Sequence, residues 1–137
     1  MGLYVSGRLI SPGRAHAPAL VLDEPLSLWG GLDPVTGRVI EPRHPQHGEL
    51  VTGRVLLMPA ARGSSSSASV LAEAARVGTA PAGIVLAEPD LILAIGAAVA
   101  DELYGIQVPI AVVTPEVLAE VRTGEPVDIG PEGLTAD

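Results

Sequence analysis

The pattern of apolar and polar residues changes about halfway along the chain. In the first half, short aliphatic stretches alternate with Gly and Pro turns, a pattern typical of β-strands. The predicted strands cover residues 3–10, 17–22 and 51–58, with a further brief strand at 38–40. Residues 26–48 hold several turn signals and are interpreted as a long loop. Loops of this length inside a compact domain are uncommon and are more often functional than decorative.

The second half predicts helices and strands in alternation. Apolar residues at helical spacing predict helices over residues 66–77, 89–104 and 115–121, with Thr114 as an N-cap and Gly78 just past the end of the first helix. Aliphatic stretches predict strands at 82–87 and 108–113, and a last edge strand at 127–129. Strands joined by helices form a parallel sheet with right-handed crossovers, while the earlier strands are expected to form a second sheet layer. The predicted fold is therefore α/β, with three layers in the order β/β/α.

The composition indicates a single domain and excludes several classes of function. A chain of 137 residues, 47% of them hydrophobic, builds one core, so residues 1–137 are expected to form a single domain. Phe is absent and aromatic residues make up 2%, so that core is aliphatic. The eight basic residues are all Arg and stand against 16 acidic ones, and a net charge of −8 excludes a basic surface for nucleic acid or an anionic membrane. Without Cys, the chain alone forms no disulfide, thiolate zinc site or Cys-held iron–sulfur cluster.

Neither a targeting segment nor a membrane span is recognised in the sequence. The N-terminus lacks the charged start and the apolar stretch of a signal peptide. The most apolar stretch, residues 80–100, is interrupted by Glu88, Pro89 and Asp90, which divides it into two short buried elements. The expectation is a soluble cytoplasmic protein.

The most informative segment is Arg62-Gly63-Ser64-Ser65-Ser66-Ser67, in which a predicted strand leads through a glycine turn into a helix. Unpaired backbone N–H groups and the helix dipole make such a start an anion site, suited to a substrate carboxylate or phosphate. The alternative is structural, because four serines also suit a flexible loop with an N-cap. A phosphate-binding loop of the Walker type is excluded, since the chain has no Lys.

A second candidate is the pair Gly30-Gly31, which precedes an Asp-Pro turn. Paired glycines permit backbone shapes and close approaches that other residues forbid. The alternative is an ordinary turn in which Trp29 anchors the loop on the core.

A possible metal site at His44 and His47 is set aside. The two histidines stand three residues apart near Glu41, but they share a face only in a helix, and the flanking prolines argue against one. We therefore expect solvated loop histidines and no metal site.

Four segments, taken in order, resemble the small subunit, or swivel domain, of the aconitase X-type dehydratases. They read GGLDPVTG at 30–37, GRVLLMP at 53–59, RGSSSS at 62–67 and APAGIV at 80–85, and the resemblance covers about residues 4–115. It implies the swivelling β/β/α fold of the aconitase swivel domain. It also implies a large partner subunit that carries an iron–sulfur cluster held by cysteines, a division that fits the absence of Cys here. The contact with this partner is expected through residues 30–37 and the serine helix start.

The resemblance also assigns roles to residues. Ser64, directly after the glycine, matches the family's catalytic base, and Arg62 occupies the basic position two residues before it. The substrate-binding residues implied are Arg62, Gly63, Ser65 and Ser66 together with the glycine pair Gly30 and Gly31. Substitution of Ser66 or Ser67 is expected to cost less activity than substitution of Ser64.

The details of the motif narrow the expected substrate. Conventional aconitases continue Gly-Ser-Ser-Arg-Glu, whereas Ser66 and Ser67 follow here, so citrate is not expected. The serine segment, His44-Pro45 and residues 100–105 resemble bacterial forms linked to cis-3-hydroxy-L-proline, and an archaeal phosphomevalonate dehydratase small subunit is the alternative.

The chemistry that the resemblance implies is elimination of water from a small hydroxy acid. Ser64, as an alkoxide, takes the proton next to a carboxylate, while a metal centre in the partner binds the leaving hydroxyl. This chain would hold no cofactor and would be active only with its large subunit. Two other classes stay open: a swivel module that binds ligand without turnover, and a purely structural serine cap.

Overall fold

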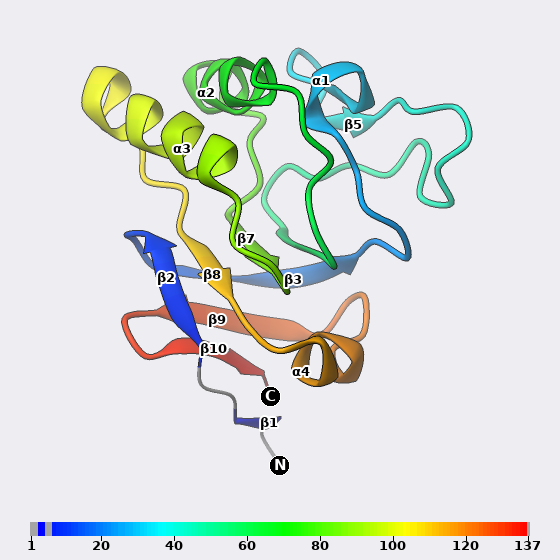
Figure 1. The fold of residues 1–137 in the computed structure, drawn as a ribbon, viewed down its shortest axis with the longest axis vertical. Coiled ribbons are helices and arrows are strands. Elements are labelled where there is room, and N and C mark those ends of the chain that lie inside the picture. The colour runs from blue at the N-terminus through cyan, green and yellow to red at the C-terminus, as the bar shows by residue number, and fades with distance from the viewer. Residues whose placement is uncertain (1–2, 5–6, 137) are drawn as a thin grey trace.

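The computed structural model describes residues 3–4 and 7–136, which hold ten strands and four helices (Figure 1). The strands are β1 Leu3–Tyr4, β2 Arg8–Ser11, β3 Ala15–Val21, β4 Leu32–Asp33, β5 Arg38–Val39, β6 Val55–Met58, β7 Gly83–Leu86, β8 Ile110–Val112, β9 Pro126–Gly130 and β10 Gly133–Ala136. The helices are α1 Leu28–Gly31, α2 Ser67–Val77, α3 Leu91–Tyr104 and α4 Pro115–Glu120.

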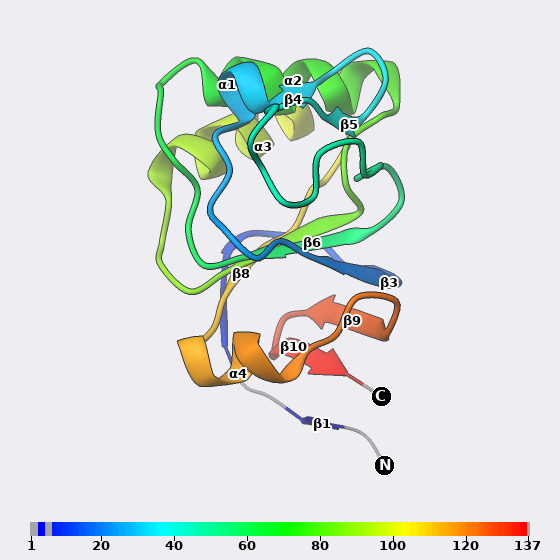
Figure 2. The ribbon, with the colours of Figure 1, turned by 90° about the vertical axis from the view of Figure 1, so that its right-hand side faces the viewer.

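Eight of the strands form one sheet in the order β1-β10-β9-β3-β6-β7-β8-β2. Its centre, β3, β6, β7 and β8, is parallel, and the flanking strands β9 and β2 pair antiparallel with it. Helices α2 and α3 connect the parallel strands and cover one face, while β9, β10 and α4 lie on the other side (Figures 1 and 2). This arrangement confirms the predicted β/β/α fold.

The parallel strands are buried on both faces, as their continuous aliphatic sequences require. In β6, Leu56 and Met58 belong to the core beneath α2 and α3, together with Leu71 and Leu93. The alternate residues of the same strand, Val55 and Leu57, belong to a second core on the side of β9 and β10. Packing in the two cores fixes the positions of the strand ends. The loops that carry the candidate site begin at those ends.

The predictions for the helices are confirmed within a residue or two. Gly78 ends α2 in the left-handed conformation, and the Asp90 side chain caps α3 by accepting from Leu93 N at 2.9 Å. Thr114 is the N-cap of α4, as predicted. None of the helices in the described residues is long and apolar enough to cross a membrane.

Two predictions about the sheet are wrong. Strand β3 pairs with β6 inside the parallel sheet, so it does not belong to a separate layer. The strand predicted at 127–129 is no edge, because β9 lies between β3 and β10. Strand β10 was not predicted, although Leu134 follows a Gly-Pro-Glu-Gly turn that is typical of a hairpin. The predicted strand at 3–10 includes residues 5–6, which lie outside the described residues.

The long loop predicted at 26–48 contains local structure. Helix α1 is a single irregular turn, and β4 and β5 form a short hairpin. Gly37 closes that hairpin with φ +76°, and a Cβ there would lie only 2.1 Å from Thr52 Oγ1, so no other residue fits. The segment is therefore held in place beside α2.

Candidate functional site

The serine segment forms a tight turn immediately before α2. Ser64 Oγ accepts a hydrogen bond from Ser66 N at 3.2 Å, and the Ser64 carbonyl accepts from Ser67 N at 2.9 Å. Across residues 7–136, no acceptor lies within bonding range of the backbone N–H groups of Gly63, Ser64 and Ser65. We call residues 63–66 the serine turn. Three free donors in succession before an eleven-residue helix can bind an anion, as the sequence predicts.

The remaining serines of the segment differ in their contacts. Ser66 occupies the N-cap position but makes no side-chain capping bond, and Ser65 is exposed. Ser67 is 1% exposed, and its Oγ accepts a hydrogen bond from Trp29 N at 3.2 Å. This bond joins the Gly30-Gly31 turn to the serine turn, so the two predicted motifs lie side by side.

The Gly30-Gly31 pair is held in position by the Trp29–Ser67 hydrogen bond and by packing against the core. Gly31 is buried, and a Cβ there would lie 2.8 Å from Leu26 Cδ1, whereas Gly30 is exposed with φ +79°. The interpretation that Trp29 anchors the loop on the core is wrong, because Trp29 is 59% exposed. The anchor is its neighbour Leu28, at 1% exposure, so the indole is left free on the surface.

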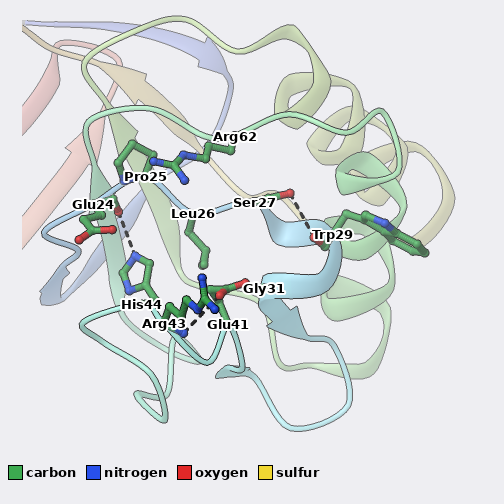
Figure 3. Close-up of a pocket in the computed structure, with 10 residues that line it drawn as sticks. All are labelled: Glu24, Pro25, Leu26, Ser27, Trp29, Gly31, Glu41, Arg43, His44 and Arg62. Atoms are coloured by element: carbon green, nitrogen blue, oxygen red, sulfur yellow. Dashed lines mark hydrogen bonds between the residues drawn. The ribbon is translucent and has the colours of Figure 1, made fainter.

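A cavity of about 270 Å³ opens beside the glycine turn (Figure 3). Arg62 reaches over it, and the backbone N of Arg62 donates to the Leu26 carbonyl at 3.2 Å, which fixes the two loops together. Charged and polar residues dominate the wall, which is formed by Glu24, Pro25, Leu26, Ser27, Trp29, Gly31, Glu41, Arg43, His44 and Arg62. The wall of the cavity therefore includes two arginines and two glutamates.

The predicted site residues divide between two neighbouring places. Arg62 and Gly31 line the cavity, while Gly63, Ser64, Ser65 and Ser66 form the serine turn next to it. Ser64 itself is half-buried and is not part of the cavity wall. Arg62 in the cavity wall and Gly63 in the serine turn are consecutive residues, so the two places are directly connected.

The prediction of two solvated histidines is wrong for His44. This side chain is 6% exposed, with Nε2 bonded to the Glu24 carbonyl at 3.0 Å and Nδ1 accepting from Gln46 N at 3.0 Å. Both ring nitrogens are therefore engaged with the backbone, so His44 supports the cavity wall. His47 is exposed, as predicted.

The described residues do not fit a metal ion, and the sequence has no Cys to hold an iron–sulfur cluster. In the part of the chain that the structure describes, there is no group of three His, Cys, Asp or Glu side chains placed to hold a metal ion. Cys is absent from the whole sequence. Any cluster chemistry therefore has to come from another chain or another part of the protein.

Sequence reasoning missed Arg43, Glu24 and Glu41 as cavity residues. Arg43 and Glu41 belong to the loop after β5 and Glu24 to the loop after β3, and only the fold brings them to Arg62. The Pro-rich sequence at 41–45 predicted an irregular segment, but nothing in it indicated which surface the segment would border.

The family model of the aconitase X swivel domain matches residues 4–135, so the chain belongs to the aconitase X swivel domain family. It is 47% identical over 104 residues to a cis-3-hydroxy-L-proline dehydratase of Pseudomonas aeruginosa, covering 76% of this chain and 18% of that protein. It is 46% identical over 98 residues to the phosphomevalonate dehydratase small subunit of Methanothermobacter thermautotrophicus, covering 72% of this chain and 75% of that subunit. The chain thus spans less than a fifth of the first relative's length.

The fold is also similar to a solved structure of the family. The crystal structure of Thermococcus kodakaraensis aconitase X in its holo-form superimposes with a TM-score of 0.85 at 28% identity, over 96% of this chain and 95% of that one. The predicted family and fold are therefore confirmed.

Proposed function

We infer that this chain is the swivel subunit of a two-part hydro-lyase that removes water from a small hydroxy acid, with Ser64 as the base. The observation that carries the proposal is the serine turn, with three free N–H donors beside the arginine-bearing cavity, in a chain of the aconitase X swivel family. A relative at 46% identity is named as a dehydratase small subunit, which supports a large-subunit partner.

In the proposed reaction, Ser64 Oγ takes the proton from the carbon next to the substrate carboxylate. Ser64 Oγ acts as the alkoxide and becomes a hydroxyl, and the C–H electron pair forms the C=C bond as the neighbouring C–O bond breaks. The departing hydroxyl takes up one proton from solvent and leaves as water, which balances the proton that Ser64 released to solvent when it ionised. The partner would supply the group that assists the departing hydroxyl, which we propose to be a Cys-held iron–sulfur cluster. This chain provides the base and the groups that bind the carboxylate.

A serine hydroxyl needs strong assistance to act as a base near neutral pH. The free N–H groups of the serine turn and the positive end of α2 stabilise negative charge at this position, and Arg62 adds a nearby cation. These interactions strengthen when water is excluded. Because Gly63 and Ser65 are exposed here, the exclusion of water is assigned to the docked partner.

The cavity charges favour cis-3-hydroxy-L-proline as the substrate. Two arginines and two glutamates line the wall, and this balance suits a zwitterion with one carboxylate and one ammonium group. Phosphomevalonate, the alternative substrate, carries a phosphate and a carboxylate and would bring more negative charge to Glu24 and Glu41. The identities to relatives named for the two substrates, 47% and 46%, do not separate them, so the choice rests on the cavity charges.

The test is to purify the chain together with its large subunit and to measure dehydration of each substrate separately. Turnover of cis-3-hydroxy-L-proline, and no comparable turnover of phosphomevalonate, is the expected result. Preference for phosphomevalonate would replace the substrate but keep the reaction. Ligand binding without turnover of either compound would instead favour a swivel module that only binds.

A further inference from the structure

The outer face of α3 is apolar and exposed in the described chain. Leu91, Ile95 and Leu103 recur along the helix at 75%, 49% and 65% exposure, with the exposed Ala98 and Val99 between them. From position 91 to position 100, the helix contains no charged or hydrogen-bonding side chain. A helix that is apolar on all sides is normally covered on all sides, whereas a surface helix has a polar outer face.

The apolar surface continues into a hollow between α2 and α3. The two helices approach closely because Gly96 lacks a side chain, and a Cβ there would lie 2.7 Å from the Ala68 carbonyl oxygen. The hollow has a volume of about 370 Å³ and is lined by Ala68, Ser69, Ala72, Glu73, Ile95, Val99 and Tyr104. The lining combines aliphatic side chains with Ser69, Glu73 and Tyr104, so the surface offers a partner both apolar contacts and a few polar groups, as protein interfaces do.

This face reaches the candidate site. The serine turn lies between α1 and α3: Ser67 binds Trp29 N on one side, and on the other a Cβ at Gly63 would lie 3.8 Å from Ile92 Cδ1. Trp29 of α1 and Ile92 of α3 therefore lie on the two sides of the turn. A protein surface that closes over Ser64 would also cover the start of α3.

We propose that the outer face of α3, defined by Leu91, Ile95, Ala98, Val99 and Leu103, docks on the large dehydratase subunit. The inference rests on the proposed function, and it assigns a surface beyond the two loops that the sequence indicated. In one relative the family domain is a named small subunit, and in another the matching region makes up 18% of a longer chain. In both relatives the domain therefore belongs with a larger protein component. The matching surface is apolar with a basic rim, because the chain has a net charge of −8 and α3 ends with Asp101 and Glu102.

The test uses two matched alanines, both exposed and both on helices. Ala98→Arg places a charge on the outer face of α3, and Ala119→Arg places the same charge on α4, on the opposite side of the sheet. Leu103→Arg is a second variant on the α3 face. Each variant is first checked for an unchanged melting curve, and its Kd for the cognate large subunit is then measured by calorimetry.

We expect Ala98→Arg and Leu103→Arg to weaken binding at least about tenfold, the effect of a charge in a desolvated interface, and Ala119→Arg to bind like the wild type. Equal binding by all three variants would overturn the α3 face while the proposed function stands. A loss of self-association in the isolated chain, with binding to the large subunit unchanged, would assign the face to a second copy instead. Absence of binding by the wild-type chain would overturn both this inference and the two-part enzyme.

Discussion

At the scale of single residues, the turn formed by the serine segment could be predicted from the sequence, but its long-range contacts could not. The order Gly-Ser-Ser before an apolar helix is local, so the serine turn could be predicted from neighbouring residues alone. The bond from Trp29 N to Ser67 Oγ joins positions 38 residues apart, and the burial of His44 depends on a carbonyl 20 residues away. Such contacts depend on the path of the chain, which local patterns do not contain.

Ser67 therefore has a structural role that the sequence did not indicate. Ser67→Ala leaves the Trp29 N–H without its acceptor at a part-buried position and is expected to reduce the free energy of unfolding by about 1 kcal/mol. Ser66→Ala is the matched control, because the Ser66 side chain makes no capping bond. Denaturant unfolding of both variants measures the difference, and equal stability of the two would contradict this role.

Arg62 lines the cavity, and we propose that it binds the substrate. Arg62→Ala removes a cation from the cavity and from the neighbourhood of Ser64, so KM should rise and kcat should fall, each by about tenfold, as for loss of a charge-assisted hydrogen bond. Steady-state kinetics of the purified complex measure both constants. Arg122→Ala, on the exposed loop after α4, is the control and should change neither. A variant with wild-type kinetics would remove Arg62 from the site.

At the scale of elements, the three longer helices and most strands of the main sheet followed from local patterns, while β10, α1 and β4 and the pairing of strands did not. Helical spacing, Gly78 and Thr114 located α2 and α4 closely, because caps and periodicity act within a few residues. The pairing of β3 with β6, and of β9 with both β3 and β10, links segments far apart in the chain. An aliphatic strand fits either sheet layer equally well, so its partner could not be read from its own sequence.

The crossing of α2 and α3 makes a prediction at this scale. Gly96→Ala places a Cβ 2.7 Å from the Ala68 carbonyl oxygen, a backbone atom, so the helices must separate. The expected loss of stability is about 1–3 kcal/mol, the usual cost of overpacking. Gly63→Ala is the control for thermal melting, since its Cβ would meet its nearest neighbour only at 3.8 Å. Melting of Gly96→Ala at the wild-type temperature would contradict this packing.

One charged pair on α2 gives a stability that depends on pH. Arg76 lowers the pKa of Glu73 through a side-chain hydrogen bond of 2.7 Å. Because the pKa of this carboxyl is depressed in the folded chain, the contribution is present above its ordinary value near 4.5 and is lost as the pH falls below it. The pair is exposed, so its effect on folding is small.

At the scale of the whole molecule, the chain contains the proposed base Ser64 and a cavity beside it, and the described residues include no group placed to hold a metal ion. The isolated chain is therefore expected to bind no iron and to show no turnover, because Cys is absent and His44 is engaged in the fold. Metal analysis and the absorption spectrum of the purified chain test this expectation. Stoichiometric iron–sulfur absorbance in the chain alone would contradict the division of the site between two subunits.

The most direct test of the serine base is the turnover number of Ser64→Ala in the complex with the large subunit. If Ser64 takes the proton, kcat should fall by about a hundred- to ten-thousand-fold, the usual contribution of a general base. Assembly and the melting temperature should stay nearly unchanged, because Ser64 Oγ accepts only one bond, from Ser66 N. Ser66→Ala in the same complex is the control and should keep most of the activity. Equal and mild losses in the two variants would mean that the serine turn is a structural cap and that the base lies elsewhere.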